Sequence, residues 1–246
     1  MSGSFDDQGR LVIGDGKILA CFGKKRSGKS VMGKLLLASY AGDRMVIAAN
    51  ADDGPFADGE TVHLVRGDVE SLPAKWPEHL RRYQGEPMTL RVEVDPGSPT
   101  FLEDQDHAVG MALRHGNCAI LVHEVGLIAP SNRVPPHMRR LLHANRHRRV
   151  TAILCGPRPI TADPLVLAQA DVVYIFETPV PDDRKRIAGS IGWKPADLDD
   201  ALEELRRHEY LRFDANEPKP EGDQEDMRLV HYPALPEDIV RAALRA

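Results

Sequence analysis

The stretch ILACFGKKRSGKSVMGKLLLAS, residues 18–39, contains the change of pattern that decides the fold. It begins with a short continuous apolar run, Ile18 to Phe22, which is typical of a strand buried on both faces. After a loop rich in glycine and basic residues, apolar residues recur at helical spacing, at Val31, Met32, Leu35 and Leu36. The stretch therefore predicts a buried strand, a tight basic loop and a helix in direct succession.

The loop has the spacing Gly23-x-x-x-x-Gly28-Lys29-Ser30, which is that of a phosphate-binding loop. Such a loop surrounds an anion with successive backbone N–H groups, and the positive end of the following helix faces the same anion. The two glycines supply backbone freedom, Lys29 is predicted to reach the β- and γ-phosphates, and the Ser30 hydroxyl is predicted to bind magnesium. A plain surface turn is the alternative, and the flanking strand and helix argue against it. The predicted nucleotide-binding residues are Gly23, Lys24, Lys25, Arg26, Ser27, Gly28, Lys29, Ser30 and Val31.

The composition suits one sizeable core. The chain has 246 residues, of which 42% are apolar, and this is enough for a single main domain. The first ten residues, MSGSFDDQGR, are polar and acidic, unlike a secretory leader, and the longest apolar stretch, 118–130, is interrupted by His123 and Glu124. We therefore expect a cytosolic protein without a membrane span. Three cysteines, at 21, 118 and 155, fall in or beside predicted core strands, where we expect them to be structural.

Strand-like runs alternate with helical patterns along most of the chain, which predicts an α/β fold with a mostly parallel central sheet and helices on both faces. The expected strands are 17–22, 45–49, 60–65, 89–94, 119–123, 150–155 and 171–176, and the expected helices are 29–40, 101–114, 135–147, 182–189 and 196–207. We expect a core over residues 1–178 and a C-terminal extension over 179–246 packed on it. The extension is predicted to contain the strand EYLRFD, a linker rich in Pro and acidic residues, a last strand and a short helix at 236–245.

The strand in AILVHEVGLIAP is predicted to carry the second half of a nucleotide site. A phosphate-loop hydrolase needs a carboxylate at the carboxyl end of a nearby buried strand to orient the attacking water, and Glu124 has that position. His123 stands where an aspartate would hold hydrated magnesium, and a neutral imidazole cannot supply that negative charge. The alternative is that His123 and Glu124 only cap a strand.

Charge is distributed unevenly. The net charge of −5 argues against a polycation that coats nucleic acid, yet RRLLHANRHRR, residues 139–149, contains five arginines and two histidines. In a helix, Arg139, His143, Arg146 and Arg149 can share one face. Without further context such a cluster is equally well a solvated helix face.

The chain resembles the FtsK/HerA superfamily of DNA-translocating ATPases in the run from residue 148 to 176, together with the loop Gly23–Ser30 and the strand LVHE. In that superfamily a strand ends in a polar Ala-Thr-Gln-Arg-Pro signature. A proline-bearing segment, a helix that ends in Asn- or Gln-Ala-Asp, and another apolar strand follow it. The corresponding segments here are LCGPRP, ADPLVLAQAD and VVYIF, with DDRKRIAG after them, and the resemblance covers roughly residues 11–214. The chain is most similar to the short branch that packages genomes into membrane-containing icosahedral viruses. The resemblance implies a RecA-like fold, with ATP and Mg²⁺ as cofactors.

Two departures from this superfamily concern hydrolysis. Its sensor glutamine, which touches the γ-phosphate or the attacking water, corresponds to Pro157, which has neither an amide side chain nor an N–H. Its magnesium-linked aspartate corresponds to His123. Either change is expected to slow hydrolysis, whereas Arg158 corresponds to the family arginine.

The resemblance also implies a ring, usually a hexamer, in which a neighbouring subunit completes each nucleotide site with an arginine. Arg146 best corresponds to this trans-acting arginine, with Arg149 and Arg148 as alternates. Double-stranded DNA is the implied partner, held through its phosphates in the pore, and a viral portal or vertex protein is a further candidate partner.

We therefore predict an ATPase that couples hydrolysis to translocation of double-stranded DNA as a viral packaging motor, with Lys29, Glu124 and Arg146 as its catalytic residues. Two alternatives remain open. One is a nucleotide-gated binding or assembly protein with weak turnover, and the other is a phosphotransferase that acts on a small molecule.

Overall fold

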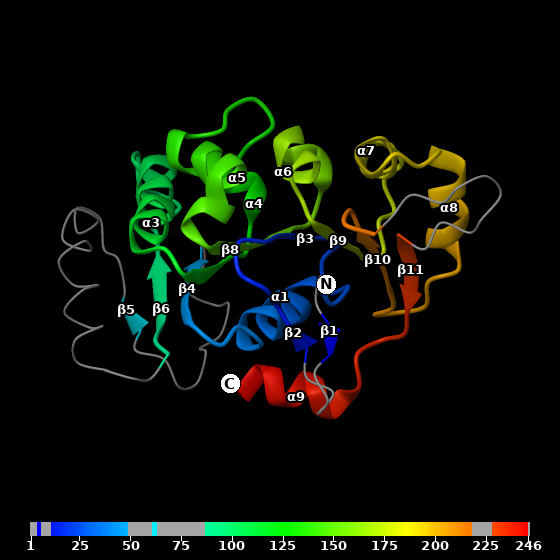
Figure 1. The fold of residues 1–246 in the computed structure, drawn as a ribbon. Helices are drawn as coiled ribbons and strands as arrows, with labels where there is room; N and C mark the ends of the chain where they lie inside the picture. Colours follow the sequence, from blue (N-terminus) through cyan, green and yellow to red (C-terminus); the bar gives the residue numbers. More distant parts are fainter. Residues whose placement is uncertain (1–3, 6–10, 49–60, 63–86, 218–227, 246) are drawn as a thin grey trace.

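A nine-stranded sheet forms the centre of the computed structural model, which describes residues 4–5, 11–48, 61–62, 87–217 and 228–245 (Figure 1). In order across the sheet, the strands are β11 (Leu229–Tyr232), β10 (Tyr210–Asp214), β9 (Val172–Ile175), β3 (Ile18–Phe22), β8 (Val150–Gly156), β7 (Cys118–Val122), β4 (Asp43–Ala48), β6 (Thr89–Glu93) and β5 (Thr61–Val62). All neighbours from β9 to β5 are parallel, whereas β10 and β11 are antiparallel additions at one edge. The predicted mostly parallel α/β sheet is confirmed.

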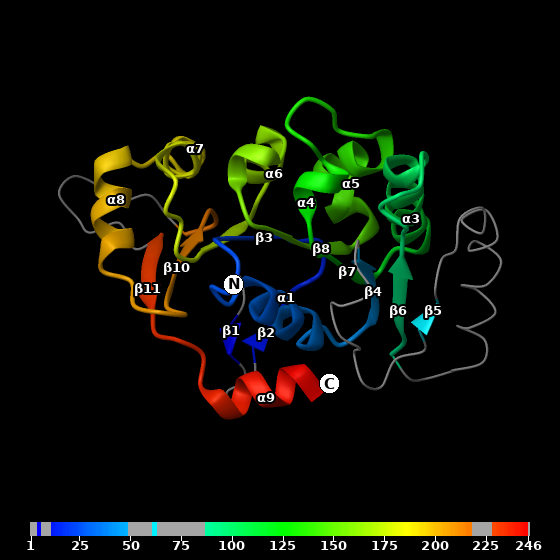
Figure 2. The same ribbon diagram turned by 180° about the vertical axis from the view of Figure 1, so that it is seen from behind.

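Helices cover both faces of the sheet (Figures 1 and 2). One face carries α3 (Phe101–His115), α4 (Val125–Ile128), α5 (Pro136–Arg148) and α6 (Pro164–Ala168), and the other carries α1 (Lys29–Ala38) and α9 (Glu237–Arg245). A small antiparallel pair, β1 (Ser4–Phe5) and β2 (Leu11–Val12), lies on the side of α1. Because both faces are covered, the central strands are apolar throughout rather than alternating, and β3, β7 and β8 are buried along their whole length.

The two faces have separate apolar cores. One core joins α3, α5 and α6 to the sheet, and the other joins α1 to it through Met32, Leu36 and Leu37. Helix α1 lies very close to the strands, since a Cβ on Gly33 would be 2.6 Å from the Cys155 sulfur. This close packing fixes the start of α1, and with it the predicted phosphate loop, against the middle of the sheet.

The strand order places β8 between β3, which leads into the predicted phosphate loop, and β7, which leads to Glu124. Phe22 pairs with Gly156, and Leu154 pairs with Val122. Glu124 lies two residues beyond Val122, so it emerges level with the end of β3. Parallel strands therefore bring the loop, the segment after β8 and Glu124 to one edge of the sheet.

The C-terminal part continues the sheet. After α7 (Pro181–Ile191) and α8 (Pro195–Glu203), β10 pairs with β9, and β11 pairs with β10. Aromatic rings connect these strands, because Tyr210 lies 5.3 Å from the Phe176 ring and stacks on Tyr232 at 5.4 Å. The C-terminal strands are thus joined directly to the strand beside the phosphate loop, while the predicted domain boundary at residue 178 stays a prediction.

Most expected elements have the predicted type, with shifts at their ends. Helix α8 ends at Glu203 instead of 207, and the expected strand 60–65 is seen as β5, the rest of that range lying outside the described residues. Five short elements were not predicted from periodicity: β1, β2, α4, the 3-10 turn Pro159–Thr161 and α6. Of these, only the helix α6 was implied by the family resemblance. The three cysteines are free and buried, as expected, and burial raises the pKa of Cys118 to about 12. Among the described helices, none is long and apolar enough to cross a membrane.

Candidate functional site

The loop between β3 and α1 has the backbone conformation of an anion-binding loop. Gly23, Arg26 and Gly28 all have positive φ angles, of 155°, 64° and 112°, and α1 begins immediately afterwards at Lys29. Positive φ values within a turn bring successive N–H groups to one concave side, where they bind anions. The amino end of α1 adds its partial positive charge at the same place. The loop is therefore built to surround phosphate, as its sequence predicts.

Both loop glycines are required for space as well as for conformation. A Cβ on Gly23 would lie 2.6 Å from Cβ of Phe176, and one on Gly28 would lie 3.2 Å from the same aromatic ring. Phe176 follows β9, and its N–H donates to the carbonyl of Phe22 (2.8 Å). Phe176 thus packs directly against the loop, and a larger residue at Gly23 would have to displace Phe176.

The polar side chains of the loop divide into buried and exposed groups. Lys29 is only 6% exposed, and within the described residues no carboxylate forms an ion pair with it. The Ser27 hydroxyl is also buried and lacks a hydrogen-bond partner in the described part of the chain. A buried ammonium and a buried hydroxyl are costly without partners, and a bound phosphate would supply acceptors for both. Lys24, Lys25 and Arg26 are exposed, whereas Ser30 and Val31 are half-buried.

Three residues that the sequence did not single out fix this loop. The N–H of Lys24 donates to the carbonyl of Glu177 (2.9 Å), and the two side chains also form an ion pair. Nδ1 of His208 lies 3.2 Å from the carbonyl oxygen of Ser27. Phe176 is the third. These residues lie about 150 to 180 positions away along the chain, so only the pairing of β9 with β3 and of β10 with β9 brings them here.

Glu124 lies at the same edge of the sheet as the loop. It is half-buried and occupies the residue immediately before α4, at the end of β7. His123 is 3% exposed. Its N–H donates to the carbonyl of Ile47 (3.3 Å), so it extends the pairing of β7 with β4 by one residue. The structure therefore brings together the loop and the carboxylate that the sequence predicts, and it places the imidazole deeper in the fold.

The segment after β8 emerges between the loop and Glu124. Pro157 is half-buried there, and the next residue, Arg158, donates from Nε to a buried carboxylate oxygen of Asp183 (3.0 Å). Asp183 lies in the first turn of α7. Arg158 is therefore bound to α7 through Asp183. Because Arg158 lies beside the candidate site, this contact links the C-terminal helices to the site.

Arg146 lies at the opposite end of the strands. It is in the last turn of α5, and one guanidinium nitrogen donates to Asp171 Oδ1 (2.7 Å) in the segment just before β9. The N–H of Asp171 in turn donates to the carbonyl of Ile18, the first residue of β3. Since β3 has five residues that each rise roughly 3.3 Å, about 16 Å of strand separates this point from the loop. Within one subunit, the structure does not bring Arg146 to the phosphate loop.

The two alternate arginines differ from Arg146 in their surroundings. Arg149 ends α5 in the left-handed conformation, with φ of 54°, so it does not continue the helical face predicted for residues 139–149. Its Nε donates to Asp15 (3.1 Å), and although partial burial works in the opposite direction, the hydrogen bonds from Arg149 and Tyr40 lower the pKa of Asp15. Arg148 is exposed.

Searches with this sequence find no matching protein-family model and no matching curated protein. Solved structures do match. The genome packaging NTPase B204 of Sulfolobus turreted icosahedral virus 2, in complex with sulfate, is 20% identical with a TM-score of 0.65, covering 89% of this chain and 97% of that one. The same protein in complex with ATP-gammaS is 21% identical with a TM-score of 0.60, covering 81% and 92%. B204 of Sulfolobus turreted icosahedral virus, described as a DNA-packaging ATPase, is 21% identical with a TM-score of 0.62, covering 91% and 100%.

At about one residue in five identical, these likenesses show a shared fold. They extend over nearly the whole length of the viral proteins and most of this chain. The resemblance that the sequence predicts is therefore confirmed at the level of the fold, which this chain shares with viral genome-packaging NTPases. The roles of Lys29, Glu124 and Arg146 stay predictions.

Proposed function

We propose that this protein is an ATPase that uses ATP hydrolysis to move double-stranded DNA, as a viral genome-packaging motor. The observation that carries the proposal is the phosphate loop, with buried Lys29, at the same sheet edge as Glu124, one strand apart from it. Support comes from the shared fold with viral packaging NTPases, one of which binds ATP-gammaS. A phosphate loop alone suits many functions, and the shared fold supports this one by analogy.

In this proposal each side chain at the edge has one task. Lys29 binds the β- and γ-phosphates, and the loop N–H groups and the amino end of α1 neutralise the remaining charge. Glu124 accepts a hydrogen bond from the attacking water and orients it toward the γ-phosphate. The Ser27 hydroxyl, which is buried and unpartnered among the described residues, would donate to a phosphate oxygen.

Magnesium fits this site as a companion of the nucleotide. No group of three or more His, Cys, Asp or Glu side chains in the described residues forms a metal site by itself. Mg²⁺ does not need one, because it usually takes one or two protein oxygens together with phosphates and water. Ser30 would supply such an oxygen. The bound ion would neutralise charge that develops on the phosphates.

Arg146 would complete the site of a neighbouring subunit in a ring, for which a hexamer is the expected form. Its side chain is 70% exposed and lies at the end of the sheet away from its own phosphate loop. An arginine supplied by a neighbour stabilises charge in the transition state of phosphoryl transfer. Hydrolysis would then require assembly, since an isolated subunit lacks that charge.

DNA would be held through its phosphates rather than its bases, because a translocase must accept every sequence. Exposed arginines of α5, Arg139, Arg140 and Arg148, are candidate phosphate contacts. A viral portal or vertex protein is a further proposed partner, and the host cytoplasm or the virion vertex is the proposed location.

A second function is favoured by one observation. Pro157 stands between the loop and Glu124 without any side-chain donor, and buried His123 precedes Glu124. A site with these two residues is expected to hydrolyse slowly. A nucleotide-gated DNA-binding or assembly protein with weak turnover is therefore the alternative.

The rate of ATP hydrolysis per subunit, measured over a range of protein concentrations with and without duplex DNA, tests the proposal. The rate per subunit is expected to rise with concentration until rings are complete, and then to increase several-fold when duplex DNA is added. The DNA effect should weaken as salt rises, because phosphate contacts release counterions. A rate per subunit that is independent of both dilution and DNA contradicts the motor, and binding of ATP and DNA with almost no hydrolysis favours the alternative.

A further inference from the structure

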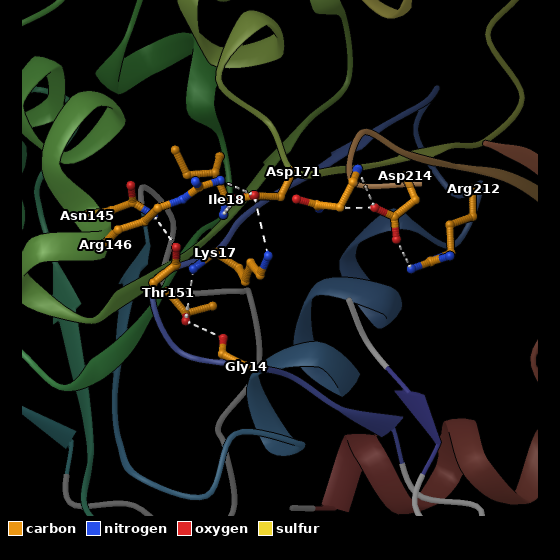
Figure 3. A network of polar contacts seen from close by, with 11 residues as sticks. Gly14, Lys17, Ile18, Asn145, Arg146, Thr151, Asp171, Arg212 and Asp214 are labelled. Atoms are coloured by element: carbon orange, nitrogen blue, oxygen red, sulfur yellow. Dashed lines mark hydrogen bonds and ion pairs between the residues drawn. The ribbon is translucent and has the colours of Figure 1, made fainter. Parts of the chain in front are cut away.

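A buried carboxylate orients the exposed Arg146 side chain at the amino end of the sheet (Figure 3). The guanidinium of Arg146 donates to Asp171 Oδ1 (2.7 Å), and the two side chains are 70% and 3% exposed. An ion pair whose arginine is exposed to solvent contributes little to the stability of the fold. Its effect is instead to hold the exposed guanidinium of Arg146 in one orientation, which the buried carboxylate of Asp171 sets.

Asp171 is fixed by the backbone on both sides. Its Oδ2 accepts a hydrogen bond from the N–H of Ile18 (2.8 Å), its own N–H donates to the carbonyl of Ile18 (2.8 Å), and its carbonyl accepts from the N–H of Ala215 (2.9 Å). Rotating the carboxylate would break the bond to Ile18 within a buried site, which is costly. Oδ1 therefore has a single position, the one from which it contacts Arg146.

The backbone of Arg146 is fixed as well. Asn145 is buried, and its Nδ2 donates to the carbonyl of Gly16 (2.8 Å). Gly16 has a φ of 66°, and a Cβ there would lie 2.9 Å from Cα of Arg146, so the last turn of α5 packs directly on this loop. Packing on Gly16 therefore fixes the Cα of Arg146. The contact with Asp171 fixes the guanidinium at the other end of the side chain (Figure 3).

A guanidinium has five N–H donors, and the Asp171 contact uses one of its nitrogens. Lys17 Nζ also lies 3.6 Å from the same oxygen of Asp171, so the carboxylate faces two cations and does not neutralise Arg146 alone. Within the described residues, Arg146 has no other side-chain hydrogen bond or ion pair, so its remaining donors could meet an anion outside the subunit. Holding such a group in its reactive orientation before the anion arrives removes an ordering cost from the reaction.

We propose that Asp171 is a positioning residue, which holds the Arg146 guanidinium in the orientation that meets the γ-phosphate bound by the adjacent subunit. This inference rests on the proposed function, because it requires Arg146 to act in a ring. Asp171 would act only through Arg146 and would not touch the nucleotide. It therefore belongs to the subunit that donates the arginine and not to the subunit that binds the ATP.

The Asp171→Asn variant tests this. It keeps the size of the side chain and an oxygen for the Ile18 N–H, but it removes the charge that orients Arg146. We expect unchanged ATP affinity and a kcat lower by roughly ten- to a hundredfold, since a displacement of about 1 Å costs on the order of a hundredfold in rate. Asp199→Asn is the matched control, because it removes a carboxylate that pairs with an arginine, Arg184, between α7 and α8. It should leave kcat unchanged.

Mixed rings separate positioning from mere loss of stability. A Lys29→Ala subunit has an intact Asp171 and Arg146, so mixing it with Asp171→Asn subunits should restore hydrolysis at interfaces where an intact loop meets an intact arginine. Mixing Asp171→Asn with Arg146→Ala should restore none, since neither subunit presents a correctly held arginine. A purely structural defect would not follow this pattern of rescue.

The outcomes distinguish the inference from its premise. If assembled Arg146→Ala rings hydrolyse ATP normally, Arg146 does not act on the neighbouring subunit's site, and the premise fails. The positioning role alone would be overturned by either of two results, provided that Arg146→Ala rings are inactive. One is wild-type turnover in Asp171→Asn rings, and the other is a failure of Lys29→Ala to rescue Asp171→Asn. Should Asp171→Asn not fold, Asp171→Glu keeps the charge but moves the carboxylate. It is expected to show the same loss of kcat, and wild-type turnover in a folded Asp171→Glu ring would overturn the proposal.

Discussion

The Lys29→Ala variant is expected to lose ATP binding and hydrolysis while it keeps its fold. Lys29 is buried at the base of the phosphate loop, and its charge has no carboxylate partner among the described residues. Truncating one member of a buried charge pair with a ligand costs about 2–5 kcal/mol, which corresponds to roughly a thirtyfold to several-thousandfold loss of affinity. Titration of a fluorescent ATP analogue, with circular dichroism to verify folding, measures this loss.

Lys185→Ala is the control for Lys29→Ala. It removes the same charge from an exposed position on α7, away from the loop, and should leave ATP affinity unchanged. The loss in Lys29→Ala should also be largest for nucleotides that carry both β- and γ-phosphates. If folded Lys29→Ala binds ATP as tightly as the wild type, the loop is not the nucleotide site.

The Glu124→Gln variant is expected to bind ATP normally and to hydrolyse it at least about a hundredfold more slowly. Gln keeps the shape of the side chain at the end of β7, so the fold and the neighbouring α4 should be unaffected. It removes the negative charge that orients and activates the water, and such groups typically contribute a factor of about a hundred to ten thousand. Single-turnover hydrolysis in assembled rings isolates this step from nucleotide binding.

Glu203→Gln, at the exposed end of α8, makes the same chemical change away from the site and should not alter the rate. Should Glu124→Gln turn over at the wild-type rate, the catalytic carboxylate lies elsewhere in the chain. Should it lose ATP affinity instead of rate, Glu124 is a structural cap at the end of β7.

The central fold could be predicted from the sequence because the sheet has helices on both faces. Each of its parallel strands is therefore a short apolar run, which can be recognised from neighbouring residues alone. The loop after Phe22 was equally readable, because its glycines and Lys29 must lie at fixed spacing to surround a phosphate. Glu124 could be placed because it directly follows such an apolar run. In each case, neighbouring residues in the sequence carry the whole signal.

What could not be predicted depends on contacts between distant segments. Phe176, Glu177 and His208 reach the phosphate loop only through the pairing of β9 with β3 and of β10 with β9. No local pattern marks them. Asp171 does end the Gln-Ala-Asp segment of the family signature, but nothing in the sequence shows that its carboxylate contacts Arg146 from a different element. The left-handed end of α5 at Arg149 is also a local backbone choice that a charge pattern does not reveal.

Displacement of a third strand from duplex DNA is the sharpest test of ATP-driven translocation by this protein. A triplex-forming oligonucleotide is bound to a linear duplex, and its release is followed after the protein is added above the concentration needed for ring assembly. Release of the third strand is expected with ATP and wild-type protein, but not with ATP-gammaS and not with Lys29→Ala. Hydrolysis of ATP that is stimulated by the duplex but leaves the third strand in place would contradict translocation.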